Sequence, residues 1–151
     1  MAVKPIPEGH HTLVPHLALK DCAKAIDFYK QAFGARENSR LSMPDGKIIH
    51  ADLSIGDSHL FVMDDPPGAS SSTPAGTIVH MWSLEPDAVF ERATKAGAKV
   101  TMPLQDMFWG DRYGQLVDPF GHAWSIAKHL EDLSPDEIKK RAMTAFTQMK
   151  K

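Results

Sequence analysis

Two stretches decide the fold: HLALKDCAKAIDFYKQAFGA at residues 16–35 and HMWSLEPDAVFERATKAGA at residues 80–98. Each begins with a strand-like run headed by a histidine, continues with apolar residues at helical spacing, and ends in a glycine followed by an alanine. The leading histidines are 64 positions apart, and the closing glycines, Gly34 and Gly97, are 63 positions apart. This nearly constant separation predicts that one structural unit occurs twice in the chain.

Together with the residues that follow these two stretches, each unit is predicted to contain a strand, a helix and three further strands. The predicted strands are 12–19, 36–43, 47–55, 58–64, 77–84, about 98–104, 112–118 and 122–128. We therefore expect an α+β fold in which two βαβββ modules form a curved sheet around a cleft, with a helix at the C-terminus. The expected single domain, residues 1–151, consists of module 1 at about 12–64, a Pro-, Gly- and Ser-rich linker at 65–76, module 2 at about 77–129 and a helix at 134–150.

The predicted helices carry start signals. Asp21 suits the N-cap of the first helix, and Pro86 suits the first turn of the second. A capping box, Ser134 with Glu137, opens the terminal helix. The apolar stripe of this helix consists of Ile138, Ala142, Ala145, Phe146 and Met149. We expect the stripe to cover either this chain's sheet or a partner. At the other end of the chain, His10 is expected to lie in a loose tail.

Length and composition limit the class of protein. Of the 151 residues, 42% are hydrophobic and 24% are charged, which is enough apolar material for a folded core. The formal net charge of −2 argues against nucleic acid as a partner, because phosphate binding needs a basic surface. The single cysteine, Cys22, cannot form an internal disulfide, and no apolar run reaches the ~20 residues that span a bilayer. We therefore expect a cytoplasmic protein that binds neither membranes nor nucleic acid.

Alternation within the strands divides side chains between two sheet faces. One helix covers only one face of its sheet, so the other face is predicted to line a cleft between the two modules. In strand 12–19 the residues expected to meet the helix are Leu13, Leu17 and Leu19, and those expected to face the cleft are Val14, His16 and Ala18. The equivalent cleft residues of strand 77–84 are Ile78, His80 and Trp82. In strand 47–55, His50 and Asp52 alternate with the apolar Ile49, Ala51, Leu53 and Ile55.

The segment FWGDRYG, residues 108–114, is predicted to contact a ligand. Its three aromatic residues, Phe108, Trp109 and Tyr113, offer flat contact area, and its glycines let the backbone bend and a ligand approach. Arg112 can form a bidentate bond to a carboxylate or a phosphate. The alternative is that Asp111 and Arg112 pair with each other or with a neighbouring strand, and that Trp109 belongs to the core.

Three segments resemble one known family. They are HLALKDCAKAIDFYKQAFGA (16–35), KIIHADLSIGDSHLFV (47–62) and, most specifically, FWGDRYGQLVDPFGHAWSIAKH (108–129). Over about residues 10–130 the chain resembles the glyoxalase/bleomycin resistance/dioxygenase superfamily, also called vicinal oxygen chelate proteins, and within it the PhnB-like branch. The resemblance implies paired βαβββ modules and usually a homodimer. It leaves the activity open, because the superfamily includes metal-dependent isomerases, dioxygenases and thiol transferases as well as metal-free drug-binding proteins.

The resemblance also implies where a metal would bind. Metal-dependent members typically place a His or Gln on the first strand of a module and a Glu on its last strand. The residues nearest these positions are Val14, Ile78 or Val79 on the first strands, and Phe61 or Met63 and Ser125 on the last strands. Because the glutamates are missing, we expect no cofactor and interpret His16 and His80 as hydrogen-bonding residues of a polar cleft. In the alternative interpretation, water or Asp64 completes a divalent-metal site beside these histidines.

Three functions are compatible with these features. The first, which we favour, is binding of a small organic ligand in an aromatic cleft without a complete metal site. The second is a metal-dependent lyase, isomerase or dioxygenase that acts on a small oxygen-rich substrate. The third is a dimeric accessory protein with a degenerate cleft. The residues expected to contact the ligand are His16, His50, His80, Trp82, Phe108, Trp109, Asp111, Arg112 and Ser125; the sequence assigns no catalytic residue.

Overall fold

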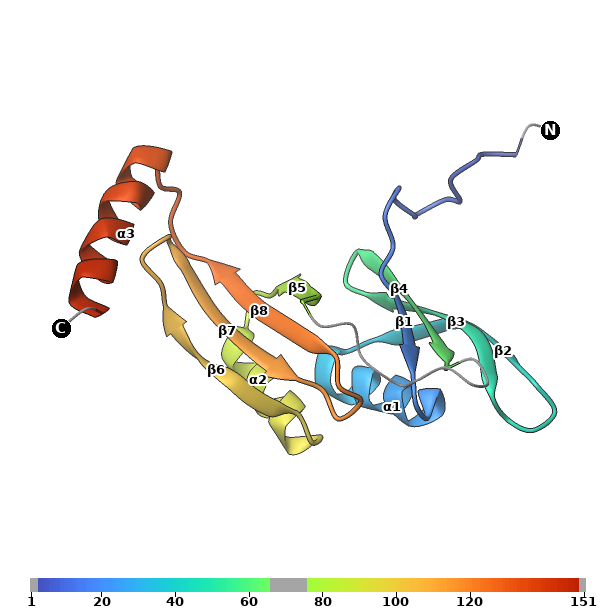
Figure 1. Cartoon of the computed structure of the whole chain (residues 1–151). Coiled ribbons are helices and arrows are strands. Elements are labelled where there is room, and N and C mark those ends of the chain that lie inside the picture. The colour runs from blue at the N-terminus through green and yellow to red at the C-terminus, as the bar shows by residue number, and fades with distance from the viewer. Residues whose placement is uncertain (1–2, 66–75, 150–151) are drawn as a thin grey trace. The chain divides into compact units, whose positions relative to one another are not determined.

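The chain divides at Gly76 into two compact units in the computed structural model (Figure 1). The structure describes residues 3–65 and 76–149. The elements in chain order are β1 (His16–Leu19), α1 (Cys22–Phe33), β2 (Arg36–Ser42), β3 (Ile48–Ile55), β4 (Ser58–Asp64), β5 (Ile78–Trp82), α2 (Pro86–Lys95), β6 (Lys99–Asp106), β7 (Asp111–Val117), β8 (Ala123–His129) and α3 (Pro135–Met149). The linker predicted at 65–76 lies, apart from its two ends, outside the described residues.

Both units have the same sheet topology. The strand order is β1-β4-β3-β2 in the first sheet and β5-β8-β7-β6 in the second. In each sheet the first strand runs parallel to the last, and the other neighbours are antiparallel. The predicted α+β class, with a repeated βαβββ unit and a C-terminal helix, is therefore confirmed. The cleft between the modules stays a prediction.

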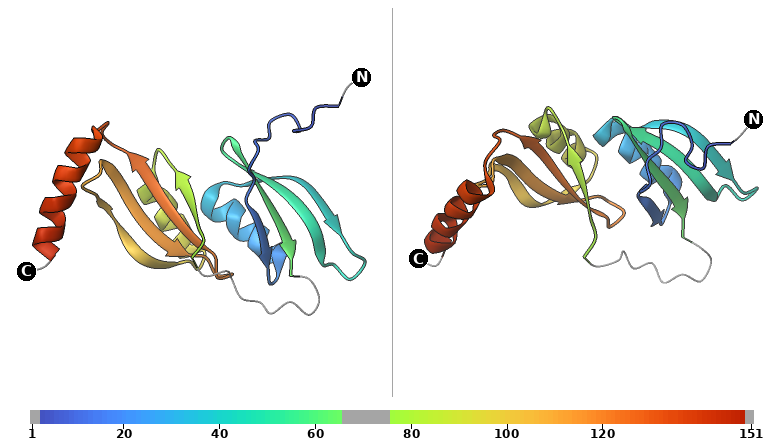
Figure 2. Two further views of the ribbon diagram at one scale, coloured as in Figure 1. Left: turned by 45° about the horizontal axis from the view of Figure 1, so that its top comes forward. Right: turned by 90° about the horizontal axis from the view of Figure 1, so that it is seen from above.

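Each sheet carries its own helix on one face (Figure 2). Helix α1 packs against β1, β3 and β4, and α2 packs against β6 and β8. Ile26 and Tyr29 of α1 are completely buried. The alternate residues Leu17 and Leu19 of β1 are also buried, with exposed fractions of 7% and 1%. Burying one large apolar side chain stabilises the fold by about 1.5–3 kcal/mol, so the helix-facing side of each strand is strongly specified.

One predicted core residue, Leu13, is exposed. Its exposed fraction is 87%, because the first strand begins at His16 rather than at residue 12. Pro15, immediately before the strand, has no N–H for the ladder and contributes its carbonyl, which accepts the Phe61 N–H at 2.9 Å. The prediction that Leu13 meets the helix is therefore wrong, whereas it holds for the other two leucines.

A bulge overturns a second prediction, that Ile49 lies on the apolar face of its strand. Leu53 of the same strand is completely buried, but Ile49 is 45% exposed. The pairing of β2 with β3 skips Ile49, which reverses the alternation at this point and gives the buried position to Ile48.

The start of α1 is capped from a distant strand. Asp21 has a left-handed backbone (φ 58°) and makes no side-chain cap, contrary to the prediction from its position. The carboxylate of Asp64, at the end of β4, accepts the Cys22 N–H at 2.9 Å and the Ile48 N–H at 2.7 Å. One side chain therefore ties α1 to β3 and β4. Burial, reinforced by the charge of Asp64, raises the pKa of the Cys22 thiol to about 12, which keeps this thiol unreactive.

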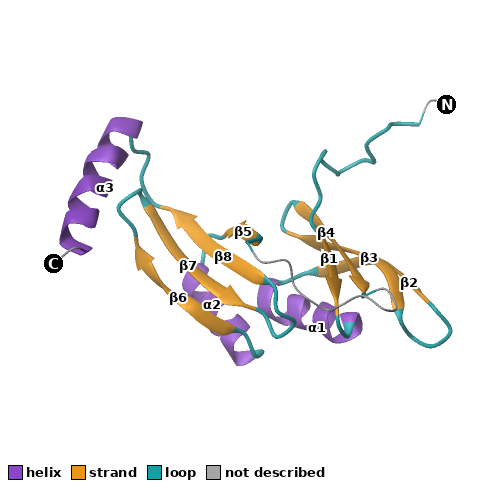
Figure 3. Ribbon diagram, in the orientation of Figure 1, coloured by secondary structure: helices purple, strands orange, loops and turns teal. Residues whose placement is uncertain are grey.

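Helix α3 begins with half of the predicted capping box, since the Glu137 N–H donates to the Ser134 hydroxyl at 3.1 Å. Figure 3 shows α3 following β8 as a separate helix. Its apolar stripe is only partly covered: Ile138 is half-buried, whereas Phe146 is 54% exposed and has its ring centroid 6.0 Å from that of Phe108. Within residues 3–65 and 76–149, no helix is long and apolar enough to cross a membrane.

The glycines of FWGDRYG serve packing and a turn rather than the approach of a ligand. A Cβ atom added to Gly114 would lie 2.7 Å from the Phe90 Cζ atom of α2 and 2.9 Å from the Met102 carbonyl oxygen of β6. Gly110 has a φ of 99°, and a Cβ atom there would lie 2.9 Å from the Glu131 carbonyl oxygen. The first position therefore sets how closely α2 approaches its sheet, and the second sets the turn before β7.

We expect Gly114→Ala to lower the free energy of unfolding by about 1–3 kcal/mol, because the added methyl group meets both a helix side chain and a strand backbone. Urea denaturation measures this free energy. Gln115→Ala, the next residue on the same strand, is the matched control and should cost less. A change for Gly114→Ala within about 0.5 kcal/mol of wild type would contradict the close packing.

Candidate ligand-binding site

The helix-free face of the second sheet carries aromatic and polar residues from three strands. His80 and Trp82 are exposed on β5, whereas the residues that alternate with them are partly buried. On β8, His80 pairs with Ser125 and Trp82 pairs with Ala127, which pairs in turn with Tyr113 on β7. Because paired residues of neighbouring strands point to the same side, these side chains share one face, as the alternation predicts for His80 and Trp82.

Five rings form a continuous series on this face, which we call the aromatic cluster: Trp109, Tyr113, His80, Trp82 and His129. Neighbouring ring centroids in this series are 5.5, 6.0, 4.6 and 6.2 Å apart. The planes of Tyr113 and His80 are 18° apart, and the other three contacts are edge-to-face. Trp82 is 60% exposed, so part of this flat apolar surface is open to solvent.

A buried carboxylate holds two rings of the aromatic cluster. Asp111 is 8% exposed; its Oδ2 accepts the Trp109 indole N–H at 3.0 Å, and its Oδ1 lies 2.8 Å from His129 Nδ1. The other ring nitrogen of His129 lies 2.7 Å from Asp132. A buried carboxylate without hydrogen-bond partners is costly, so Asp111 keeps both of these hydrogen bonds. The two bonds fix the Trp109 and His129 rings in position.

His80 is oriented by Ser125, its partner on the neighbouring strand β8. The His80 Nδ1 and Ser125 Oγ atoms are 2.6 Å apart, and Ser125 is only 2% exposed. Partial burial lowers the pKa of the His80 imidazole, an effect that the charge of Asp111 opposes. At pH 7 the ring is therefore neutral and carries one hydrogen-bond donor and one acceptor.

The pKa of His129 is shifted in the opposite direction. Its hydrogen bonds to Asp132 and then to Asp111 raise the pKa of the imidazole. Because this pKa is raised by folding, the pairing stabilises the protein fully below the ordinary histidine pKa, near 6.5, and is lost as the pH rises through the folded value. Just above pH 6.5, the aromatic cluster therefore holds one neutral and one protonated histidine.

An NMR titration should separate these two histidines. The His80 imidazole is expected to titrate below about pH 6.5 and the His129 imidazole above it. Asp132→Asn removes the main partner of His129, so it should lower the His129 midpoint and leave that of His80 unchanged. Equal midpoints in wild type, or a His129 midpoint insensitive to Asp132→Asn, would contradict this arrangement.

The helix-free face of the first sheet gathers histidines around one phenyl ring. The ring centroid of Phe61 on β4 lies 4.8 Å from that of His50 on β3 and 6.0 Å from that of His16 on β1. His16 and His50 are also 6.0 Å apart, edge to face. The structure thus brings together the two histidines that alternation predicts for this face.

Arg112 lies apart from the other expected ligand-contacting residues. It alternates with Tyr113 along β7 and makes a two-pronged bond to Asp87 of α2, at 2.7 and 2.9 Å. A third bond, at 3.1 Å, joins it to Asp106. Its guanidinium is therefore engaged by two carboxylates on the helix side. The bond to Asp106 of β6 is the pairing with a neighbouring strand that the alternative predicts, whereas Asp87 lies on a helix and Asp111 is not its partner. We leave Arg112 out of the candidate site.

Of the aromatic cluster, the sequence does not predict His129, and it predicts Tyr113 only as part of the segment FWGDRYG. Tyr113 lies beside His80 of β5 because β8 pairs with both β5 and β7, an order that alternation within one strand does not reveal. His129 is recruited by Asp111 across the ladder, a pairing that depends on strand register. Phe108 packs in the turn before β7 against Trp109, with ring centroids 5.0 Å apart, and its contact with a ligand stays a prediction.

The repeated βαβββ architecture agrees with a known family. The family model described as Glyoxalase/Bleomycin resistance protein/Dioxygenase superfamily matches residues 9–126, a range that runs from the first unit into β8 of the second. The chain belongs to this superfamily. The resemblance predicted from the three quoted segments is therefore confirmed.

Relatives within the superfamily include a protein of Mycobacterium tuberculosis strain H37Rv, Uncharacterized protein Rv0887c, which is 46% identical over 135 residues, covering 84% of this chain and 79% of that protein. The crystal structure of TioX from Micromonospora sp. ML1 is 35% identical with a TM-score of 0.65, covering 80% of this chain and 99% of TioX. A PhnB protein from Bacillus cereus has a TM-score of 0.68 at 18% identity, covering 78% and 99% of the two chains, and supports the fold alone.

The residues at and beside the positions where the superfamily resemblance places metal ligands do not fit a divalent ion. At the first-strand positions, Val14 and Ile78 or Val79 have no donor side chain, and the nearest donors, His16 and His80, follow shortly after them. The parallel first and last strands of each unit pair His16 with Phe61 and His80 with Ser125. A phenyl ring has no donor atom, and the Ser125 hydroxyl is engaged by His80. Asp64, the remaining candidate, caps α1. Each pair therefore supplies one imidazole and no carboxylate, which is too few ligands to hold a divalent ion.

Proposed function

We propose that this superfamily member binds a small, flat organic molecule on the aromatic cluster without a metal ion. The observation that carries the proposal is Trp82, a large indole that is 60% exposed although four further rings adjoin it in series. Exposed aromatic surface with polar groups at its edge is the usual composition of a small-molecule site. Stacking on Trp82 would remove this surface from water.

The charges around the aromatic cluster favour a neutral or cationic ligand over an anion. Asp111 and Asp132 both contact the His129 ring, so the group carries a net charge of about −1 when His129 is protonated and about −2 when it is neutral. The neutral His80 imidazole offers a hydrogen bond to the ligand's edge, and Ser125 keeps that ring in place. We therefore propose an aromatic ring system with an uncharged polar group at one edge.

The setting of this function is part of the proposal. Members of the superfamily commonly bind small molecules and form dimers. We propose that this chain acts as a cytoplasmic homodimer whose ligands reach the helix-free faces of the sheets, and that residues on the first sheet, His16 and His50, also contact them.

Binding of 2-naphthamide, a neutral two-ring probe, tests the proposal by calorimetry in the presence of a chelator. Trp82→Ala should weaken binding by about tenfold, the usual cost of truncating an aromatic anchor. Leu84→Ala is the matched control, because Leu84 is 85% exposed just beyond β5 and lies outside the aromatic cluster, so it should leave the affinity unchanged. The anion 2-naphthoate should bind more weakly than 2-naphthamide.

Two results would contradict the proposal. Equal affinities for wild type and Trp82→Ala would place any binding elsewhere. Binding that appears only when Ni²⁺, Fe²⁺ or Mn²⁺ replaces the chelator would favour the metal-dependent lyase, isomerase or dioxygenase instead.

A further inference from the structure

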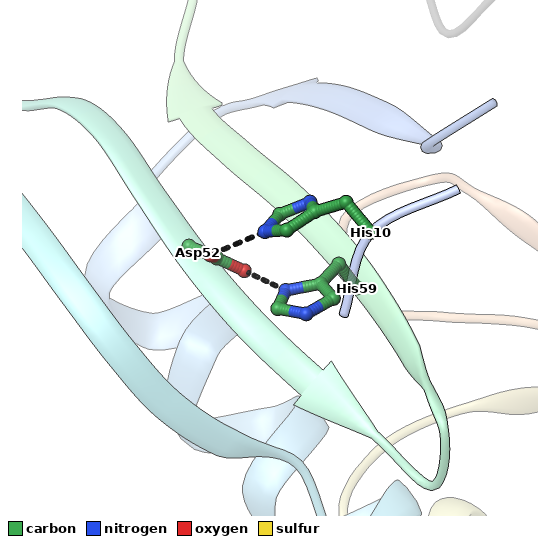
Figure 4. Close-up of side chains that lie close together, drawn as sticks. All are labelled: His10, Asp52 and His59. Carbon is green, nitrogen blue, oxygen red and sulfur yellow. Dashed lines mark hydrogen bonds and ion pairs between the residues drawn. The ribbon is translucent and has the colours of Figure 1, made fainter. Parts of the chain in front are cut away.

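We propose that the first unit holds a site for a divalent transition-metal ion, formed by His10, Asp52 and His59. One potential ligand atom from each of these three side chains lies within 4.8 Å of the other two (Figure 4). The site differs from the superfamily positions tested above, which use the first and last strands of each unit. It also shares no residue with the aromatic cluster, so the two proposals stand independently.

The sheet itself places two of the three side chains together. Asp52 on β3 pairs directly with Phe61 on β4, and His59 lies two residues before Phe61 on the same strand. Asp52 and His59 are therefore diagonal neighbours on the helix-free face. The separation of His59 Nδ1 from Asp52 Oδ1 is 2.7 Å.

The third side chain comes from the segment before β1, contrary to the expectation that His10 lies in a loose tail. The His10 N–H donates to the Pro7 carbonyl at 3.0 Å and closes a turn in which Gly9 has a φ of 80°. This turn lies against the sheet, since a Cβ atom on Gly9 would be 3.8 Å from His59 Nε2. The His10 ring stacks on the His59 ring, with centroids 3.7 Å apart and planes 20° apart.

The two stacked rings direct one nitrogen each at the same carboxylate, as Figure 4 shows. His10 Nε2 lies 3.8 Å from Asp52 Oδ2, and His59 Nδ1 lies 2.7 Å from Asp52 Oδ1. Ligands at about 2.0–2.1 Å from one zinc-type ion are roughly 3.0–3.4 Å from each other, a value between these two distances. Small side-chain rotations would therefore allow all three atoms to bind one ion.

The surroundings also suit an ion. The three side chains are only 14–18% exposed, which shields their charges from water without closing the site. Asn38 lies 3.4 Å from Asp52 Oδ1 and donates to Ser54 at 2.7 Å, so it supports the carboxylate from the side. The Phe61 ring, 5.8 Å from the His10 ring, packs beside the imidazoles.

Two imidazole nitrogens and one carboxylate favour Zn²⁺, Co²⁺, Ni²⁺ or Cu²⁺ over Ca²⁺ and Mg²⁺, which prefer oxygen ligands. Three protein ligands leave at least one position for water or for another molecule. Metal binding requires each ligating nitrogen to be unprotonated, so a neutral His59 would bind through Nδ1 and carry its proton on Nε2, and the ion would take the place of the hydrogen bond between His59 and Asp52.

Titration with Co²⁺ alone, followed by visible absorption, and with Zn²⁺ alone, followed by calorimetry, tests this site on untagged full-length protein. We expect one ion per chain and a rise in the melting temperature. His10→Ala, His59→Ala and the isosteric Asp52→Asn should each weaken binding at least tenfold. His11→Ala is the matched control, because it removes an adjacent, exposed imidazole outside the cluster.

Each alternative has a distinct outcome. If the cluster is only a hydrogen-bonded group, Co²⁺ and Zn²⁺ will bind weakly and equally to wild type, Asp52→Asn and His11→Ala, and the proposal is overturned. Loss of binding in His16→Ala or His50→Ala, with His10→Ala unaffected, would also overturn it. Far-UV circular dichroism without metal confirms that each variant is folded, so that a loss of affinity reports on the ligands.

Discussion

Both sites proposed for this protein depend on one constraint, which is that the helix of each unit covers only one face of its four-stranded sheet. Apolar burial requires the strands to send alternate side chains under the helix, as Leu17 and Leu19 show in the first unit. The residues in between must then face away from it. Because of this constraint, alternate residues of neighbouring strands lie side by side on the helix-free face of each unit, where polar and aromatic side chains are not needed for the core.

The same constraint yields two chemically different faces. On the first sheet the helix-free residues include several histidines around Phe61 and one carboxylate, Asp52, whose oxygens face the His10 and His59 rings. On the second sheet they are aromatic, and the carboxylate of Asp111 serves to hold Trp109 and His129. The two units thus share one architecture, and we propose a metal ion for the helix-free face of the first and a flat organic molecule for that of the second.

Much of this arrangement is predictable from local pattern, and the failures have physical causes. Repeat spacing and turn residues predict the order of elements, and alternation predicts the exposure of His16, His80 and Trp82. It fails at Ile49, where a bulge reverses the parity. His10 could not have been predicted, because its position depends on a turn docking on the sheet and not on any strand period.

The most direct test of the account follows the indole N–H signals of Trp82, Trp109 and Trp124 by NMR while 2-naphthamide is added. Trp124 is buried on the helix side of β8, where its indole N–H donates to Asp118 at 2.9 Å. The account predicts that the Trp82 and Trp109 signals shift and that the Trp124 signal stays in place. A shift of Trp124 with Trp82 unmoved would contradict the claim that the helix-free face carries the ligand.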